Sequence, residues 1–112
     1  MGILKQKLVD ARELLSKPEN WTKGTRARDF YRRSVDTKAP EACQWCLLGA
    51  LDKVSDCQSQ FVSLIRAMRT VSNANSSTAL FTFNDRRSTK HADVIALFDR
   101  AIESLEKNPL TP

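Results

Sequence analysis

Apolar residues recur at helical spacing near both ends of the chain. The N-terminal stripe consists of Leu4, Leu8, Ala11 and Leu15. It predicts a helix over residues 3–16, which Pro18 then stops. The C-terminal stripe runs through three turns and consists of Val94, Leu97, Phe98, Ala101, Ile102 and Leu105. We expect Ser88 or Thr89 to cap this last helix, with Asp93 in its first turns.

A second helix is predicted over residues 40–54, because Pro40 suits the first turn of a helix. It would place Trp45, Cys46 and Gly49 on one face. Glycine costs about 1 kcal/mol relative to alanine in a helix interior. Gly49 therefore indicates that another backbone or a ligand approaches this face closely.

Two further segments fit short helices. Asp56 can cap a third helix, whose apolar stripe consists of Phe61, Leu64, Ile65 and Met68. The polar run 72–77 is interpreted as a turn. Residues 79–83 are too few to assign by period, and we favour helix because no second strand is evident to pair with them.

The segment 21–39 has no sustained apolar period and is interpreted as a long loop, with one short helical turn around residues 28–32. The predicted fold class is thus all-α, a compact bundle of about four main helices with a long loop between helices one and two. A chain of 112 residues is the usual size of one domain, so we expect residues 1–112 to form a single helical domain.

Charge is unevenly distributed along the chain. The net charge is +5, and residues 1–38 hold ten Lys or Arg against five Asp or Glu, whereas residues 39–112 hold eight of each. The basic residues between positions 23 and 38 are Lys23, Arg26, Arg28, Arg32, Arg33 and Lys38. This surplus favours a phosphate-bearing or acidic partner.

No segment resembles a membrane span, a secretion signal or a lipidation site. Three cysteines make an odd count, which favours reduced thiols over a disulfide framework. We therefore expect a cytoplasmic protein that does not bind membranes.

Four blocks of residues occur in a fixed order along the chain. The first two blocks are Trp21-Thr22-Lys23-Gly24 with Ala27-Arg28-Asp29, and Ala42 with Trp45-Cys46-Leu47 and Gly49-Ala50-Leu51. The last two are Phe83-Asn84-Asp85, and Thr89 with Val94 and Leu97-Phe98-Asp99-Arg100-Ala101-Ile102. Together these blocks resemble a family of small proteins of unknown function encoded by bacteria and their phages. The resemblance implies a helical fold and a bacterial or phage origin, hence the host cytoplasm if phage-encoded, but no activity.

This chain departs from the family pattern at three places. Phe83 stands where a tryptophan is usual, and glycines are missing after Asp29 and between Asn84 and Thr89. The turns at the last two places are expected to differ in geometry.

Cys43, Cys46, Cys57 and His91 are residue types that can bind zinc. However, the Cys43–Cys46 pair falls in a predicted helix beside a tryptophan, where cysteine usually packs as a small core residue. No nucleophile motif accompanies His91, and no pair of carboxylates suggests acid–base chemistry. We expect no metal, no cofactor and no enzymatic activity.

The best candidate site joins the 21–29 loop to the 84–89 turn. Its residues are Trp21, Lys23, Arg26, Arg28, Asp29, Asn84 and Asp85. They are explained structurally if Asp and Asn fix turns and Arg28 pairs with a carboxylate. They are explained functionally if Arg28 and the N-terminus of the last helix bind a small anion, such as a nucleotide.

The leading hypothesis is a non-enzymatic binding protein that uses this site for a small anionic ligand or a host partner protein. The alternative is a nucleic-acid-binding accessory protein, because the basic 23–38 segment is interleaved with Phe30 and Tyr31. Homo-oligomerisation is also compatible with two tryptophans and five phenylalanines in a small bundle.

Overall fold

A computed structural model describes residues 2–107 and contains, over that range, five α-helices and a small antiparallel sheet. The helices are α1 (Ile3–Leu14), α2 (Leu47–Val54), α3 (Gln58–Ser72), α4 (Ser77–Asp85) and α5 (His91–Lys107). A 3-10 turn, η1 (Pro18–Asn20), follows α1, and the strands are β1 (Ala27–Arg28) and β2 (Gln44–Trp45). The fold is therefore mostly helical, but it is not purely all-α, and the expected count of four helices is one too low.

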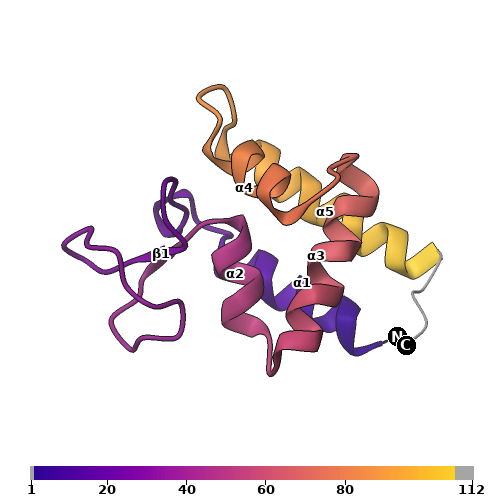
Figure 1. Ribbon diagram of the computed structural model, residues 1–112, viewed down its shortest axis with the longest axis horizontal. Helices are drawn as coiled ribbons and strands as arrows, with labels where there is room; N and C mark the ends of the chain where they lie inside the picture. Colours follow the sequence, from indigo (N-terminus) through magenta and orange to yellow (C-terminus); the bar gives the residue numbers. More distant parts are fainter. Residues whose placement is uncertain (1, 108–112) are drawn as a thin grey trace.

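The helices pack around one apolar core. α5 lies against α1 and α3, and α2 lies between α1 and α4 (Figure 1). Leu8 of α1, Leu64 of α3 and Phe98 of α5 are each completely buried. The stripes at the two ends of the chain therefore face the same core, since each helix must cover its apolar face.

The second helix is shorter than its pattern predicts. It begins at Leu47 and not at residue 40, because Gln44 and Trp45 pair with β1 as a strand. Cys46 is the N-cap of α2, and its Sγ accepts a hydrogen bond from the Gly49 N–H at 3.3 Å. Cys43 thus lies outside the helix, contrary to the prediction.

Three other boundaries also differ from the sequence prediction. Asp56 does not cap α3, because the N-cap is Cys57, which makes no side-chain cap hydrogen bond. The turn between α3 and α4 is shorter than predicted, since α3 continues to Ser72 and α4 begins at Ser77. Asn84 and Asp85 therefore end α4 and do not lie in a loop.

The start of the last helix is shifted as well. α5 begins at His91, two residues beyond Thr89, so neither Ser88 nor Thr89 is its cap. The Asp93 carboxylate in the first turn accepts a hydrogen bond from the Lys90 N–H at 2.8 Å. The Asp93 side chain thus occupies the N-terminal end of α5, where a negative charge is favoured by the helix dipole.

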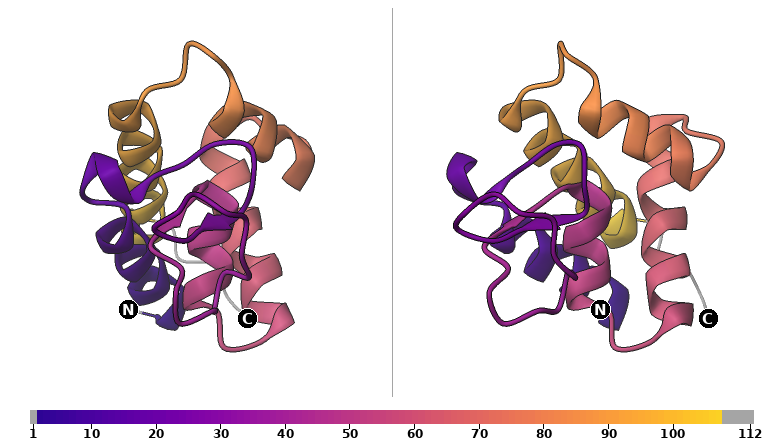
Figure 2. Two further views of the ribbon diagram at one scale, coloured as in Figure 1. Left: turned by 90° about the vertical axis from the view of Figure 1, so that its left-hand side faces the viewer. Right: turned by 60° about the vertical axis from the view of Figure 1, so that its left-hand side comes forward.

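The segment 21–46 lies at one end of the bundle, where its loops extend away from the helices (Figures 1 and 2). The two short strands of this segment, β1 and β2, form the two-stranded sheet. Among residues 2–107, no helix is long and apolar enough to cross a membrane.

Candidate functional site

Strand β1 is the centre of the 21–46 segment. On one side Ala27 pairs with Trp45 and Arg28 with Gln44. On the other side the Val35 N–H donates to the Ala27 carbonyl at 3.0 Å, and Arg28 bridges to Ser34. Residues 28–34 therefore form a small hairpin, and the helical turn expected around residues 28–32 is absent.

Helix α2 contacts this strand through a glycine. A Cβ added to Gly49 would lie 1.9 Å from the carbonyl oxygen of Arg26, which is far inside van der Waals contact. The Arg26 carbonyl also accepts a hydrogen bond from the Cys46 N–H at 3.1 Å. The close backbone approach that Gly49 predicted is confirmed, and the neighbour is the protein's own loop.

Asn84 joins three separate parts of the chain. Its Oδ1 accepts hydrogen bonds from the Trp21 indole N–H at 2.7 Å and from the Leu47 backbone N–H at 3.0 Å. Its Nδ2 donates to the Thr22 carbonyl at 3.1 Å and to Asp85 Oδ1 at 3.0 Å. Asn84 is completely buried, so this side chain fixes the 21–22 segment against α2 and α4.

Asp85 and Lys23 extend the same junction at the surface. Asp85 Oδ1 accepts a hydrogen bond from the Gly24 N–H at 3.0 Å, and Lys23 Nζ donates to the Arg86 carbonyl at 2.7 Å. Lys23 Nζ also lies 5.3 Å from the centre of the Trp21 ring. The structure therefore brings together the 21–24 and 84–86 segments, but their polar groups bind one another.

Arg28 holds the hairpin to this junction. Its Nε donates to Thr22 Oγ1 at 2.9 Å, its Nη2 to the Lys23 carbonyl at 3.0 Å and its Nη1 to the Arg32 carbonyl at 2.9 Å. The expected partner of Arg28 was a carboxylate, and its observed partners are a hydroxyl and two carbonyl groups. The planar guanidinium group is suited to binding several acceptors in fixed directions.

Asp29 and Arg33 close the end of the hairpin. Asp29 is 3% exposed and accepts hydrogen bonds from the Arg33 N–H at 2.9 Å and from Arg33 Nε at 2.8 Å. Burial by itself raises the pKa of Asp29, but the hydrogen bonds and the charge of Arg33 outweigh it, so that this pKa is lowered from its usual value. Asp29 is therefore a charged structural residue of the turn.

The turn presents two aromatic rings to solvent. Phe30 is 83% exposed and Tyr31 is 74% exposed, with their ring centres 5.5 Å apart in an edge-to-face arrangement. The Arg33 guanidinium lies 5.4 Å from the centre of the Tyr31 ring. We call residues 29–33 the aromatic tip.

Arg32 gives the aromatic tip an unusual backbone. Its φ is 66°, a left-handed conformation that costs a non-glycine residue about 1–2 kcal/mol. This is the turn after Asp29, where the family pattern has a glycine, and glycine would adopt such a conformation without the steric cost. A left-handed non-glycine residue beside exposed aromatic rings makes this turn a candidate functional surface.

The other basic residues of the segment mostly bind within the chain. Lys38 Nζ donates to the carbonyl groups of Asp52, Lys53 and Ser55 at the end of α2, at 2.7 to 3.1 Å. The Arg26 guanidinium lies 5.5 Å from the centre of the Phe61 ring. The basic run is therefore not one continuous patch of free cations.

The residues considered for metal binding or catalysis are dispersed. Cys46 is buried, which raises its thiol pKa to about 11, whereas Cys43 and Cys57 are exposed. A hydrogen bond from the Ser59 side chain lowers the pKa of Cys57. His91 Nε2 lies 2.6 Å from the Leu15 carbonyl oxygen, and residues 2–107 contain no group of three potential metal ligands.

Sequence reasoning did not place Phe30 and Tyr31 among the site residues. The sequence shows them only as aromatic residues within a basic run. Their exposure to solvent depends on the hairpin, which places them at its turn. The sequence feature that could have indicated their exposure is the presence of two adjacent aromatic residues in a polar segment that has no apolar period.

Comparison with known proteins assigns the chain to a family without an assigned function. Residues 4–104 match the family model described as a family of unknown function (DUF6197). The chain belongs to this family. Neither the curated proteins nor the solved structures gave a match.

Proposed function

We propose that this protein is a non-enzymatic binding protein whose aromatic tip docks a partner protein. The exposure of Phe30 and Tyr31 on a braced turn carries the proposal. Aromatic residues and arginine are the types that contribute most energy to protein interfaces. A turn already fixed by the Asp29–Arg33 bonds loses little conformational freedom on binding.

Charge favours an acidic partner over a second copy of the chain. Arg32 follows the rings directly, its side chain contacts the uncharged Gln44 amide, and the whole chain carries +5. Two copies meeting through their tips would bring their Arg32 side chains together, which costs free energy. If the chain has the bacterial or phage origin that its motifs suggest, the partner would be a cytoplasmic host protein.

A small anionic ligand at the 21–29 and 84–89 segments is supported less well. The polar atoms of Asn84, Asp85 and Arg28 bind other parts of the junction, and Asp93 occupies the end of α5. A ligand there would have to replace bonds that hold the segment in place. We therefore assign these residues the role of supporting the tip.

Nucleic acid is supported less well for a related reason. Tight binding to a phosphate backbone requires several free cations along one surface. Here Lys38 and Arg28 bind backbone carbonyl groups, and the Asp29 carboxylate neutralises Arg33. The rings could still stack on bases, so the test must separate the two partners.

A photo-crosslinking amino acid placed at position 30 in cells of the natural host tests the proposal. The matched control position is Val62, an exposed apolar residue on α3 that is 44% exposed. We expect a protease-sensitive, nuclease-resistant product of defined mass from position 30 and not from position 62. A nuclease-sensitive product would instead identify nucleic acid and overturn the proposal.

Substitution of the rings provides the second arm of the experiment. Because both rings are exposed, Phe30→Ser with Tyr31→Ser should change the free energy of unfolding by less than about 0.5 kcal/mol. For this variant the photo-crosslinking amino acid is placed at position 32. The double variant should then no longer give the crosslinked product with the partner. Retention of the partner by a folded double variant would reject the tip as the docking surface.

A further inference from the structure

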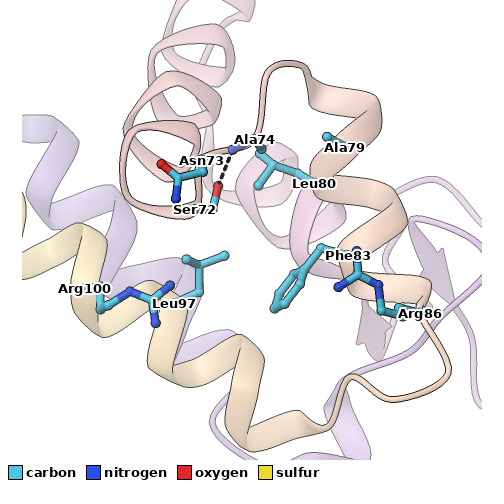
Figure 3. A pocket seen from close by; sticks show the side chains of 9 residues that line it. All are labelled: Ser72, Asn73, Ala74, Ala79, Leu80, Phe83, Arg86, Leu97 and Arg100. Atoms are coloured by element: carbon cyan, nitrogen blue, oxygen red, sulfur yellow. Dashed lines mark hydrogen bonds between the residues drawn. The ribbon is translucent and has the colours of Figure 1, made fainter.

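A separate hollow contains no residue of the segment 21–46 in its lining. It has a volume of about 260 Å³ and lies between the end of α3, helix α4 and the middle of α5. The lining residues are Ser72, Asn73, Ala74, Ala79, Leu80, Phe83, Arg86, Leu97 and Arg100. Figure 3 shows the Phe83 ring and the Leu97 side chain in its centre, with Arg100 extending from α5 toward Leu97.

The floor of this hollow is apolar and its borders are cationic. Leu80 and Leu97 are buried and form the floor together with the half-buried Phe83. Arg86 and Arg100 are exposed, and neither guanidinium group has a hydrogen-bond or ion-pair partner among residues 2–107. None of the lining residues carries a carboxylate.

The wall at the end of α3 is preformed. Arg69 donates to the carbonyl groups of Ala74 and Asn75 at 3.3 and 2.8 Å, and Ser72 Oγ accepts from the Ala74 N–H at 3.3 Å. These bonds hold Asn73 in a left-handed conformation with φ at 61°. A preformed pocket binds a small ligand without first having to order its own wall.

We propose that this hollow binds a small organic anion, consisting of a ring that packs on Phe83 and Leu97 and a carboxylate or phosphate group that binds either Arg86 or Arg100, which lie on opposite sides of the two apolar side chains (Figure 3). Guanidinium groups bind both anions with paired hydrogen bonds. A neighbouring hollow shares Arg100 but contains the Glu103 carboxylate, which would repel an anion. The site is distinct from the aromatic tip, and neither proposal depends on the other.

Protein-observed NMR with phenyl phosphate tests the site, with inorganic phosphate and phenol as half-ligand controls. We expect saturable shifts of the Asn73, Leu80 and Leu97 amide signals with a Kd of about 1 mM or tighter, and binding at least tenfold weaker for either control. Equal affinity for inorganic phosphate would show attraction to charge alone and overturn the proposal. If phenol bound as tightly as phenyl phosphate, the hollow would be an apolar pocket without an anion site, which would also overturn the proposal.

Single substitutions assign the cationic groups. One of the two variants Arg86→Ala and Arg100→Ala should weaken phenyl phosphate binding at least fivefold while the rest of the amide spectrum stays unchanged. Arg87→Ala is the matched control, since Arg87 is exposed, adjacent in sequence and absent from the lining. Losses of the same size for all three variants would overturn the assignment, as would unchanged binding in both pocket variants.

Discussion

The helical core and the segment 21–46 are held in place by different forces. In the core, completely buried apolar side chains such as Leu8 and Phe98 contact one another. The segment is held by polar side chains that bind backbone groups: Asn84 of α4 donates to the Thr22 carbonyl, and within the segment Arg28 donates to the Lys23 carbonyl and Lys38 to the Ser55 carbonyl. Apolar contacts can repack after substitution, whereas a lost polar partner leaves a donor or acceptor unsatisfied.

The difference suggests a division of roles. The core fixes where α2, α4 and α5 lie, and the hydrogen bonds from these helices then fix an irregular segment that could not bury enough apolar surface to order itself. The Phe30 and Tyr31 rings are the part of this segment that is neither buried in the core nor held by polar bonds. The following predictions test this division, beginning with the largest expected effect.

Phe98→Ala should destabilise the whole molecule most. Removing a completely buried phenylalanine typically lowers the free energy of unfolding by about 3–5 kcal/mol. Urea denaturation followed by circular dichroism measures the change, and Phe30→Ala is the matched control, because Phe30 is exposed. Similar stabilities of the two variants would contradict the placement of Phe98 in the core.

Asn84→Ala should have the next largest effect. It leaves the Trp21 indole N–H and the Leu47 N–H without their shared acceptor, so we expect a loss of about 2–4 kcal/mol. Asn75→Ala, in the exposed turn before α4, should cost less than about 0.5 kcal/mol. A double-mutant cycle with Trp21→Phe should give a coupling energy of about 1 kcal/mol, and strict additivity would argue against the bond.

Gly49→Ala tests whether the loop and α2 are in tight contact. Alanine would normally stabilise a helix interior by about 1 kcal/mol. Here its Cβ would meet the Arg26 carbonyl, and overpacking of this kind costs about 1–3 kcal/mol. Thermal unfolding should therefore show a lower Tm, whereas Gly2→Ala, whose Cβ would have no contact closer than 3.9 Å, should leave it unchanged.

Arg32→Gly should act in the opposite direction. Glycine adopts the left-handed conformation of residue 32 without the steric cost, so the variant should be more stable by up to about 1 kcal/mol. Arg33→Gly is the control, because it removes the hydrogen bond and ion pair from Arg33 Nε to the Asp29 carboxylate and should be destabilising. A lower Tm for Arg32→Gly would show that this conformation is not strained.

Acid should affect the aromatic tip selectively. Because the pKa of Asp29 is lowered on folding, its stabilising contribution is present above the usual carboxyl pKa of about 3.9 and is lost as the pH falls through the lower folded value. The protection of the Arg33 amide, measured as its exchange rate relative to the intrinsic rate at the same pH, should therefore decrease at acidic pH. In the Asp29→Asn variant the Arg33 amide should already exchange faster at neutral pH. Because the variant has no carboxylate at position 29, acid should cause no further loss of protection through this residue.

Local sequence predicted the elements whose apolar period is complete within one helix. The stripes of α1 and α5 needed no knowledge of their neighbours, whereas a helix at residues 79–83 was favoured only because no strand was evident to pair with them. Gly49 also correctly indicated that another backbone approaches α2 closely, because glycine destabilises a helix interior and is expected there mainly where a larger side chain would not fit. The partner in that approach could not be predicted from the residue itself.

Tertiary structure decided what the residues around positions 21–46 do. Gln44 and Trp45 have a helical pattern, yet they pair with β1, which is 16 residues away or more. Asn84 and Arg28 carry donors and acceptors that fit a ligand or a backbone equally well, and only the folded chain brings the Thr22 and Lys23 carbonyl groups to them. The apolar period fixes a local helix because neighbouring turns are close in sequence. The junction and the exposed rings depend on groups that folding alone brings together.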